Sequence, residues 1–267
     1  MKILTFNTHS LEEKHMRIKQ VQFVQAVARI EPDVIALQEV NQTFESDSLD
    51  EKSVNPGIPF REDNHAHMIA QLLKQNGLQY EMAWLPVKTG YGKYDEGLAF
   101  FTKKKMLEVR STLLSEKDDY SDFRTRRSLE VKTEDGWFVN VHMGWWNDEL
   151  EPFRKQWERL RKNLESQGTV YVMGDFNADA NVRGEGYDLV KESGYLDLFS
   201  LAEKKDDGFT VVQKIDGWRD GDHPAKMRID HIFCSEKVNV ALARTAFNGK
   251  EEPVLSDHYG LLAQISE

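Results

Sequence analysis

The sequence predicts an α/β protein in which packed β-sheets are covered by a few helices. Two observations support this fold class: short apolar segments recur along the whole chain, and only a few amphipathic helical segments stand between them. Elements of this kind bury their apolar faces by packing sheet on sheet and helix on sheet. No internal repeat or low-complexity tract divides the chain, so we expect one domain over residues 1–267.

The strands are predicted from short apolar or β-branched runs that end at turn-forming or charged residues. Each run is too short for a buried helix and is flanked by polar residues. The predicted strands span residues 1–8, 33–40, 78–85, 97–102, 106–114, 127–132, 137–143, 169–173, 228–233, 238–246 and 259–265.

The first predicted helix follows the first strand. Val21, Val24 and Ala28 place apolar side chains on one face, and Pro32 ends the helix. Residues 41–64, which come after the next strand, are polar and contain proline and glycine. We expect this segment to be a loop at the rim of a site.

Three further helices are predicted. The segment 65–76 has apolar residues one turn apart and is followed by Gly77, a residue well suited to end a helix. The segment 153–164 has large apolar residues at positions i, i+4, i+7 and i+11 and ends before Gly168. A short helix is expected over 187–192.

Composition excludes several classes of protein. The 35 basic and 45 acidic residues give a net charge of −10, and 40% hydrophobic residues are enough to bury a core. No apolar run approaches the roughly 20 residues that span a bilayer. The acidic balance disfavours broad binding to nucleic acid. Cys234 is the only cysteine, which excludes an intrachain disulfide and a zinc-thiolate site. With no secretory signal, we expect a cytoplasmic protein.

Polar residues with catalytic chemistry recur at the ends of the predicted strands. A strand end is a rigid place to hold a functional side chain. Taken singly, each such residue also fits a turn or a cap. Their order along one chain makes them informative. The residues are Asn7, Glu39, Glu96, His142, Asp175, Asn177, Asp230, Asp257 and His258.

This order resembles the endonuclease/exonuclease/phosphatase superfamily, whose members include DNase I-like nucleases, sphingomyelinases and inositol-polyphosphate phosphatases. The most specific segments are Gly-Asp-Phe-Asn at 174–177 and Ser-Asp-His at 256–258. The resemblance extends from Asn7 to His258. It implies a DNase I-like four-layer α/β/β/α sandwich of two mixed β-sheets flanked by helices. The strand ends would meet in one phosphate-cleaving pocket.

The resemblance implies a metal site made of oxygen ligands. Glu39 is the expected main ligand, supported by Asn7 and Asp257. Carboxylates and an amide suit a hard cation such as Mg²⁺ or Mn²⁺. A divalent ion on the phosphate oxygens lowers the barrier to attack on a charged ester.

The same resemblance assigns catalytic roles. Asp175 would take a proton from the attacking water, and Asn177 would donate a hydrogen bond to the phosphate. His258, oriented by Asp230, would stabilise the transition-state phosphate.

Glu96 and His142 form a second expected acid/base pair, in which the carboxylate holds the imidazole in one tautomer. Of the other histidines, only His9 and His231 lie beside motif residues.

Four loop segments rich in aromatic, glycine and polar residues narrow the substrate. They resemble the maltose 6'-phosphate phosphatase branch of the superfamily, which implies cytoplasmic dephosphorylation of a disaccharide phosphate. Trp145 and Trp146 either stack on a sugar ring or pack in the core or rim. The segments are 91–97, 142–148, 182–188 and 215–218. Candidate phosphate or sugar contacts are Arg126, Arg127, Arg183 and Arg219.

Three functions remain in competition. A phosphomonoesterase acting on a small sugar phosphate is favoured. A metal-dependent nuclease or sphingomyelinase would need a basic groove or an exposed apolar hairpin that docks on membranes, and the sequence shows neither convincingly. An inactive binding module is disfavoured because every expected catalytic position carries a chemically competent residue.

Overall fold

The computed structural model describes residues 1–50, 52–164, 167–215, 218 and 224–266, and it confirms the predicted fold class. Most of the predicted helices and strands are present, with shifted ends. The helical elements are η1 (Ser10–Glu12), α1 (Met16–Ile30), α2 (His65–Gln75), α3 (Phe153–Leu164), α4 (Gly186–Glu192) and α5 (Leu198–Leu201).

Over the described residues, the strands form two sheets. In spatial order, the first consists of β10 (Lys204–Lys205), β12 (Val240–Ala246), β13 (Gly260–Ile265), β1 (Lys2–Asn7), β2 (Val34–Thr43), β4 (Tyr94–Thr102) and β3 (Glu81–Gly90). The second consists of β5 (Glu108–Leu113), β6 (Arg127–Thr133), β7 (Gly136–His142), β8 (Val170–Asp175), β11 (Asp230–Cys234) and β9 (Leu196–Asp197).

Both sheets are mixed. The pairs β1–β2 and β10–β12 are parallel in the first sheet, and β7–β8 is parallel in the second. The other described strand pairs, such as β1–β13 and β8–β11, are antiparallel. This agrees with the mixed sheets that the sequence resemblance implies.

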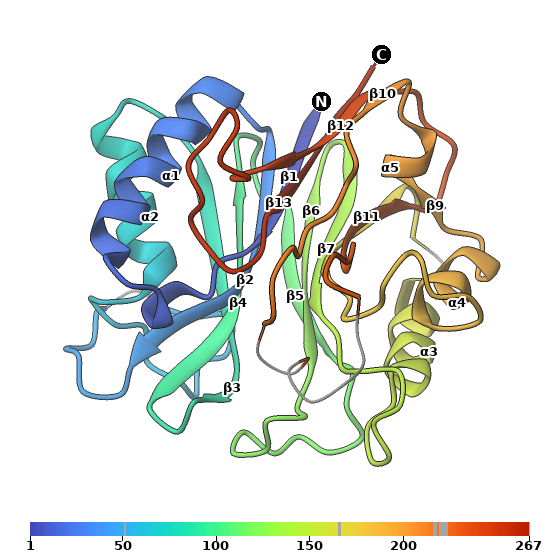
Figure 1. Ribbon diagram of the computed structural model, residues 1–267. Helices are drawn as coiled ribbons and strands as arrows, with labels where there is room; N and C mark the ends of the chain where they lie inside the picture. The colour runs from blue at the N-terminus through green and yellow to red at the C-terminus, as the bar shows by residue number, and fades with distance from the viewer. Residues whose placement is uncertain (51, 165–166, 216–217, 219–223, 267) are drawn as a thin grey trace.

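Three apolar clusters hold four layers together (Figure 1). The first lies between the sheets and includes Phe100 from β4 and Phe138 from β7. The second joins the first sheet to α1 and α2, and the third joins the second sheet to α3 and α4. Fully burying one large apolar side chain contributes about 1.5–3 kcal/mol, so these interfaces supply most of the favourable free energy of folding.

Helix α1 turns a partly different face to the core than the one predicted. Val21 is 42% exposed and Ala28 is also exposed, whereas Phe23, Val27 and Ile30 are buried in the second cluster. The observed face removes more apolar surface from water than a face ending in Ala28 would. Val24 is buried as predicted, whereas Val21 and Ala28 are not, so the predicted face was only partly correct.

Several predicted boundaries also shift. β2 continues to Thr43, so the loop begins three residues later than expected, and Asn64 caps α2 by accepting hydrogen bonds from two backbone amides. β4 begins at Tyr94, which places Glu96 inside the strand instead of before it. Among the described residues, no helix has the length and apolar character needed to span a bilayer.

Candidate active site

The sheet topology gathers the polar strand ends at one edge of the sandwich. Asn7, His142 and Asp175 are the last residues of β1, β7 and β8. Asp230 begins β11, which runs antiparallel to β8 and pairs Asp230 directly with Asp175. His258 precedes β13, which is antiparallel to β1. Ends of parallel strands and starts of antiparallel ones therefore meet at the same edge.

Glu39 reaches this edge through a β-bulge. In the β2–β4 ladder Leu37 pairs with Ala99 and Val40 with Gly97, so two residues of β2 oppose one residue of β4. Glu39 has φ 53°, in the left-handed region. A bulge of this kind changes the direction of a side chain. It brings Glu39 Oε1 within 2.9 Å of Asn7 Nδ2.

A cavity of about 250 Å³ opens at the same edge. The predicted residues that line it are Glu39, Glu96, Arg126, His142, Trp145, Asp175, Asn177, Asp257 and His258. Lys88 and Phe123 also line it, and no sequence pattern had indicated either residue. Tyr91 belongs to a segment that was noted for its composition.

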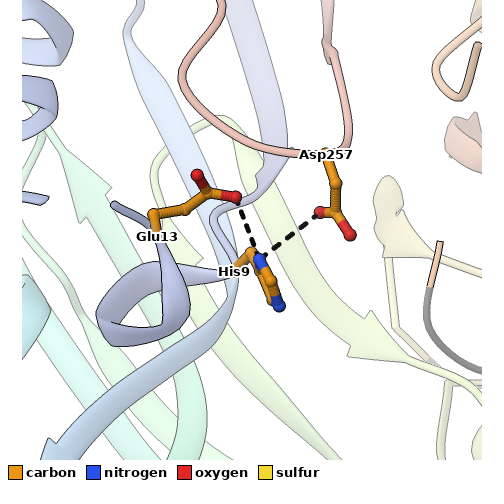
Figure 2. A group of neighbouring side chains, drawn as sticks. All are labelled: His9, Glu13 and Asp257. Carbon is orange, nitrogen blue, oxygen red and sulfur yellow. Dashed lines mark hydrogen bonds and ion pairs between the residues drawn. The ribbon is translucent and has the colours of Figure 1, made fainter. Parts of the chain in front are cut away.

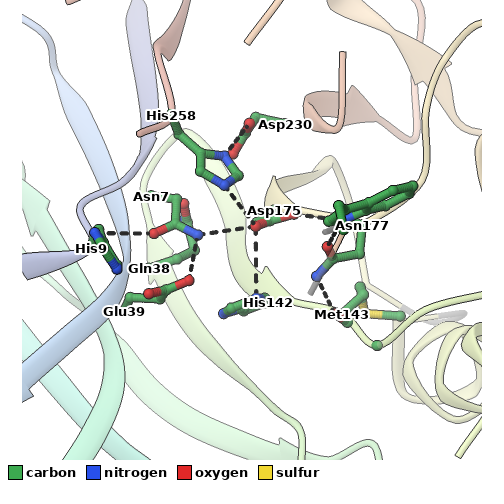
Figure 3. A network of polar contacts seen from close by, with 12 residues as sticks. Asn7, His9, Gln38, Glu39, His142, Met143, Asp175, Asn177, Asp230 and His258 are labelled. Carbon is green, nitrogen blue, oxygen red and sulfur yellow. Dashed lines mark hydrogen bonds and ion pairs between the residues drawn. The ribbon is translucent and has the colours of Figure 1, made fainter. Parts of the chain in front are cut away.

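Asp175 lies at the centre of a polar network (Figure 3). Its Oδ2 atom is 3.0 Å from Asn7 Nδ2, 3.6 Å from His142 Nε2 and 3.8 Å from His258 Nε2. Burial, together with the charge of Asp230, raises the pKa of Asp175 to about 6. A carboxylate with a pKa in this range suits general base catalysis near neutral pH.

The two imidazoles beside Asp175 have opposite charge preferences. Burial alone would lower the pKa of His258, but the ion pair with Asp230, whose Oδ2 is 2.9 Å from Nδ1, outweighs it. The net effect raises the pKa of His258 to about 10. Burial and the positive charges of Arg126 and Lys88 lower the pKa of His142 well below its ordinary value. One cationic and one neutral ring therefore flank the carboxylate.

Glu96 and His142, which were expected to pair, each contact another residue. Glu96 Oε1 is 3.0 Å from Lys88 Nζ, and the two residues are paired in the β3–β4 ladder. This register places the lysine directly beside the glutamate. His142 belongs to the second sheet and lies next to Asp175. Among the described residues no hydrogen bond or ion pair joins Glu96 to His142, although both line the cavity, so the expected acid/base pairing stays a prediction.

Trp145 lines the cavity, but Trp146 does not. Trp146 packs against Phe153 at a centroid distance of 6.3 Å, on the third apolar cluster. The sequence left open whether these tryptophans stack on a sugar or pack in the core or rim. Trp146 has the packing role, whereas Trp145 lies where a ligand can contact it.

Two of the candidate arginines lie away from the cavity lining. Arg183 has a side chain that is 60% exposed, and its Nη1 is 2.9 Å from Asp188 Oδ1. Arg127 pairs with Asp118. Each cation pairs with a nearby carboxylate and does not line the cavity, so the structure gives no support to the prediction of Arg183 as a substrate contact. Arg219 lies outside the described residues.

Asn177 is held tightly at the cavity wall. Its backbone amide donates to Asp175 Oδ1, and its Nδ2 donates to the carbonyl of Met143 at 2.9 Å. Trp218 Nε1 donates to Asn177 Oδ1 at 2.8 Å. An amide nitrogen has two hydrogens, so one donor of Asn177 Nδ2 is left for a ligand.

Backbone strain is concentrated at this cavity. His9, Glu39, Tyr91 and Asn177 all have positive φ angles and all line it. Such conformations are uncommon for residues other than glycine and cost roughly 1–3 kcal/mol each. Strain of this size is typical of a site whose geometry serves a ligand.

A second polar cluster adjoins the cavity (Figure 2). His9 Nδ1 is 2.9 Å from Glu13 Oε1 and 3.9 Å from Asp257 Oδ1. Burial would lower the pKa of His9, but Glu13 and Asp257 raise it to about 9. The imidazolium of His9 therefore neutralises part of the charge around Asp257.

The residues expected to bind a metal suit a hard divalent cation. Glu39 Oε2 is buried without a hydrogen-bond partner. Burial and the negative charges of Glu96 and Asp257 raise the pKa of Glu39 to about 7, against the opposing effects of the Asn7 hydrogen bond and the charge of His9. Asn7 and Asp257 supply further oxygen atoms at the same edge. An oxygen-only donor set of this kind fits Mg²⁺ or Mn²⁺.

Comparison with known families decides the assignment. The Endonuclease/Exonuclease/phosphatase family matches residues 4–258, a span that includes every strand end described above. The chain belongs to this family. It is therefore a phosphoric ester hydrolase of a metal-dependent superfamily.

Solved structures support the family fold over the whole chain. An endonuclease/exonuclease/phosphatase family protein from Leptotrichia buccalis is 31% identical, with 100% of each chain covered and a TM-score of 0.87. A mannosyl-6-phosphatase from Bacteroides thetaiotaomicron is 16% identical, with 100% of each chain covered and a TM-score of 0.66. A 3' phosphatase from Neisseria, solved with a product DNA hairpin, is 20% identical, with 100% of each chain covered and a TM-score of 0.65. A sequence search found no match among curated proteins.

Proposed function

We propose that this enzyme is an Mg²⁺-dependent phosphomonoesterase that releases phosphate from a sugar phosphate. Maltose 6'-phosphate is the first substrate to test. The observation that carries the proposal is the composition of the cavity, in which aromatic side chains surround the catalytic carboxylates. Tyr91 and Phe123 are 47% and 49% exposed there, and Trp145 lines the same wall.

Exposed aromatic rings beside a polar centre favour a sugar. A pyranose has an apolar face of C–H groups that packs on a flat ring, while its hydroxyls bond to carboxylates and amides. Leaving Tyr91 and Phe123 in water is unfavourable unless a ligand covers them. A cavity of about 250 Å³ also suits a compact ligand better than a long polymer.

Glu39, Asn7 and Asp257 would hold the divalent cation, which supplies Lewis acid stabilisation of the phosphate oxygens. Asp175 would accept a proton from the attacking water, because its Oδ2 lies at the cavity between two imidazoles. The new P–O bond forms as the bond to the sugar oxygen breaks. The sugar oxygen takes up a proton as it leaves, which balances the proton that Asp175 accepts from the water, and inorganic phosphate is the second product.

His258 and Asn177 would stabilise charge on the phosphate. The ion pair with Asp230 keeps the His258 ring oriented and positive. The remaining hydrogen of Asn177 Nδ2 would bond a phosphate oxygen. Donors fixed in advance in a buried site are effective because they need no reorganisation during the reaction.

A phosphodiesterase or nuclease is the second candidate. The Neisseria 3' phosphatase was solved with DNA, and it has the same fold. The net charge of −10 argues against this alternative, because affinity for nucleic acid depends on neutralising phosphates with Lys and Arg. The proposal places the reaction in the cytoplasm, which the single, buried Cys234 suits.

The test is a phosphate-release screen with Mg²⁺ and with EDTA. It compares maltose 6'-phosphate, mannose 6-phosphate, an aryl phosphate and 3'-phosphorylated DNA, with Asp175→Asn as the inactive control. We expect a sugar phosphate to have the highest kcat/KM. The proposal would be rejected in favour of a nuclease if DNA were the best substrate and sugar phosphates were hydrolysed no faster than by Asp175→Asn.

A further inference from the structure

Arg126 is a buried cation without a carboxylate partner. The residue is 2% exposed and lines the cavity. Its Nη1 donates to the backbone carbonyls of Phe123 and Thr125, and no carboxylate in the described part of the chain forms an ion pair with it. Nε is buried with no hydrogen-bond partner. The guanidinium also lies over the Trp145 ring, 5.9 Å from its centroid, so its charge meets an aromatic face but no carboxylate, and part of its donor capacity is unused.

The neighbouring charges do not neutralise Arg126. Lys88 is the other buried cation of this wall, and it already pairs with Glu96. His142 is held in the neutral form by the two cations. The negative charges of Glu96, Asp175 and Glu39 act on Arg126, with Glu96 the strongest, but none of these carboxylates forms an ion pair with it. The positive charge of Arg126 therefore remains without an ion-pair partner at the cavity.

A buried and unpaired charge is costly for a folded protein. Arg126 is nevertheless fixed by two backbone carbonyls in a position facing the catalytic edge. A ligand anion would satisfy it. Guanidinium groups bind phosphate oxygens with strong, charge-assisted hydrogen bonds.

We propose that Arg126 binds the terminal oxygens of the phosphate and makes the enzyme select monoesters over diesters. This inference rests on the proposed phosphomonoesterase function but does not depend on which sugar is attached. A monoester carries a charge between −1.5 and −2 at neutral pH by the usual value of about 6 for its second pKa. A diester carries a single charge and has a second organic group on one of these oxygens. Both differences weaken its interaction with a buried guanidinium.

The experiment measures binding of inorganic phosphate and of dimethyl phosphate to the Mg²⁺-loaded protein by calorimetry. Wild-type protein should prefer inorganic phosphate. Arg126→Gln should weaken phosphate binding by about 10- to 100-fold, the range expected for a lost charge-assisted hydrogen bond. Binding of dimethyl phosphate should change by less than about threefold. The kcat/KM of an aryl phosphate should fall by a similar 10- to 100-fold.

Arg159→Gln is the matched control. Arg159 Nη1 also donates to a backbone carbonyl, that of Leu114, but Arg159 does not line the cavity. Its replacement should leave the binding of both anions unchanged. Wild-type phosphate affinity in a folded Arg126→Gln variant, or equal losses for both anions, would overturn the proposal and assign Arg126 a purely structural role.

If Arg126→Gln fails to fold, the same binding measurements on Arg126→Lys test the proposal. It retains the positive charge, so a preference for inorganic phosphate should survive with reduced affinity. A folded lysine variant without any preference would contradict the proposal. Loss of phosphate binding in the Arg126 variants together with no activity on sugar phosphates would leave Arg126 as the phosphate site. It would reject only the sugar assignment.

Discussion

Gln38 and Asn140 form a 2.7 Å hydrogen bond across the interface between the two sheets. Asn140 Nδ2 also donates to the carbonyls of Leu37 and Ala99, the residue pair at which the bulge begins. The bulge interrupts the β2–β4 ladder, and the amide from the opposite sheet replaces hydrogen bonds that the ladder would have made. The direction of Glu39 therefore depends on a side chain in the other sheet.

Replacing Asn140 by Leu should destabilise the protein and also weaken metal binding. Two buried carbonyls would lose their donor, which costs about 1–3 kcal/mol for each group. Chemical denaturation measures the stability, and calorimetry with Mn²⁺ measures the affinity. Asn163→Leu, on the exposed surface of α3, is the control. A loss of stability with unchanged metal affinity would mean that the bulge persists without Asn140.

Removing the charge of Glu39 should abolish metal-dependent stabilisation. A ligand that binds only the folded state raises the melting temperature, so Mg²⁺ should raise the Tm of wild-type protein but not of Glu39→Gln. EDTA should abolish activity. Glu158→Gln, an exposed carboxylate on α3, should respond to Mg²⁺ like the wild type. Full turnover in excess EDTA would refute the metal requirement.

Asp230 and His258 should behave as one unit in catalysis. Asp230→Asn removes the negative charge that orients the ring at 2.9 Å, and His258→Gln removes the ring. Each single change should lower kcat by about 10²-fold or more, and the double variant should be little worse. Asp207→Asn, at an exposed position, corrects for general effects. Additive free energies in this cycle would show that the contact has no part in catalysis.

Trp145 and Trp146 should respond differently to alanine substitution. Trp145→Ala should lower kcat/KM for a disaccharide phosphate by about tenfold more than for an aryl phosphate, because only the disaccharide has a second ring, remote from the phosphate, whose contact can be lost. Trp146→Ala should leave the ratio unchanged and lower the stability by about 2 kcal/mol through lost packing. The same phosphate-release assay measures, for each variant, the ratio of kcat/KM for the disaccharide phosphate to kcat/KM for the aryl phosphate. Equal losses on both substrates with Trp145→Ala would reveal a structural role.

His65 should make the protein less stable in mild acid. Burial lowers the pKa of its imidazole from 6.5 to about 3, and Gln20 lies 3.0 Å from Nδ1. The unfolded chain therefore binds a proton that the folded chain refuses. Stability should fall by about 1.4 kcal/mol per pH unit as the pH drops below roughly 6.5.

Urea denaturation between pH 4 and 7 checks this dependence. His65→Gln should show a shallower slope than the wild type over this range. His15→Gln removes an exposed histidine and is the surface control. An unchanged slope in a folded His65→Gln variant would mean that other groups cause the acid sensitivity.

The sequence predicted the positions of polar residues at strand ends well, because these positions depend on local patterns. Asn7, His142 and Asp175 follow apolar runs, and the alternation of such runs also revealed the sheets and the main helices. The contact between Asp230 and His258 was expected from the family resemblance and is present at 2.9 Å.

Features that depend on register could not be predicted from the sequence. No pattern around Glu39 reveals the bulge, and the pairing of Lys88 with Glu96 requires knowing how β3 aligns with β4. Trp145 and Trp146 are chemically identical neighbours. Only the direction of the backbone after β7 decides which one faces the cavity.

The central place of β13 has a consequence for biosynthesis. β13 is the last strand of the described chain to leave the ribosome, yet it inserts between β12 and β1 in the middle of the first sheet. Asp257 and His258 immediately precede it. Pairing of the earliest and latest strands is a contact of high sequence separation and is slow to form. The site therefore becomes complete only after β13 has paired with β1, although Asn7 and Glu39 are synthesised long before that strand.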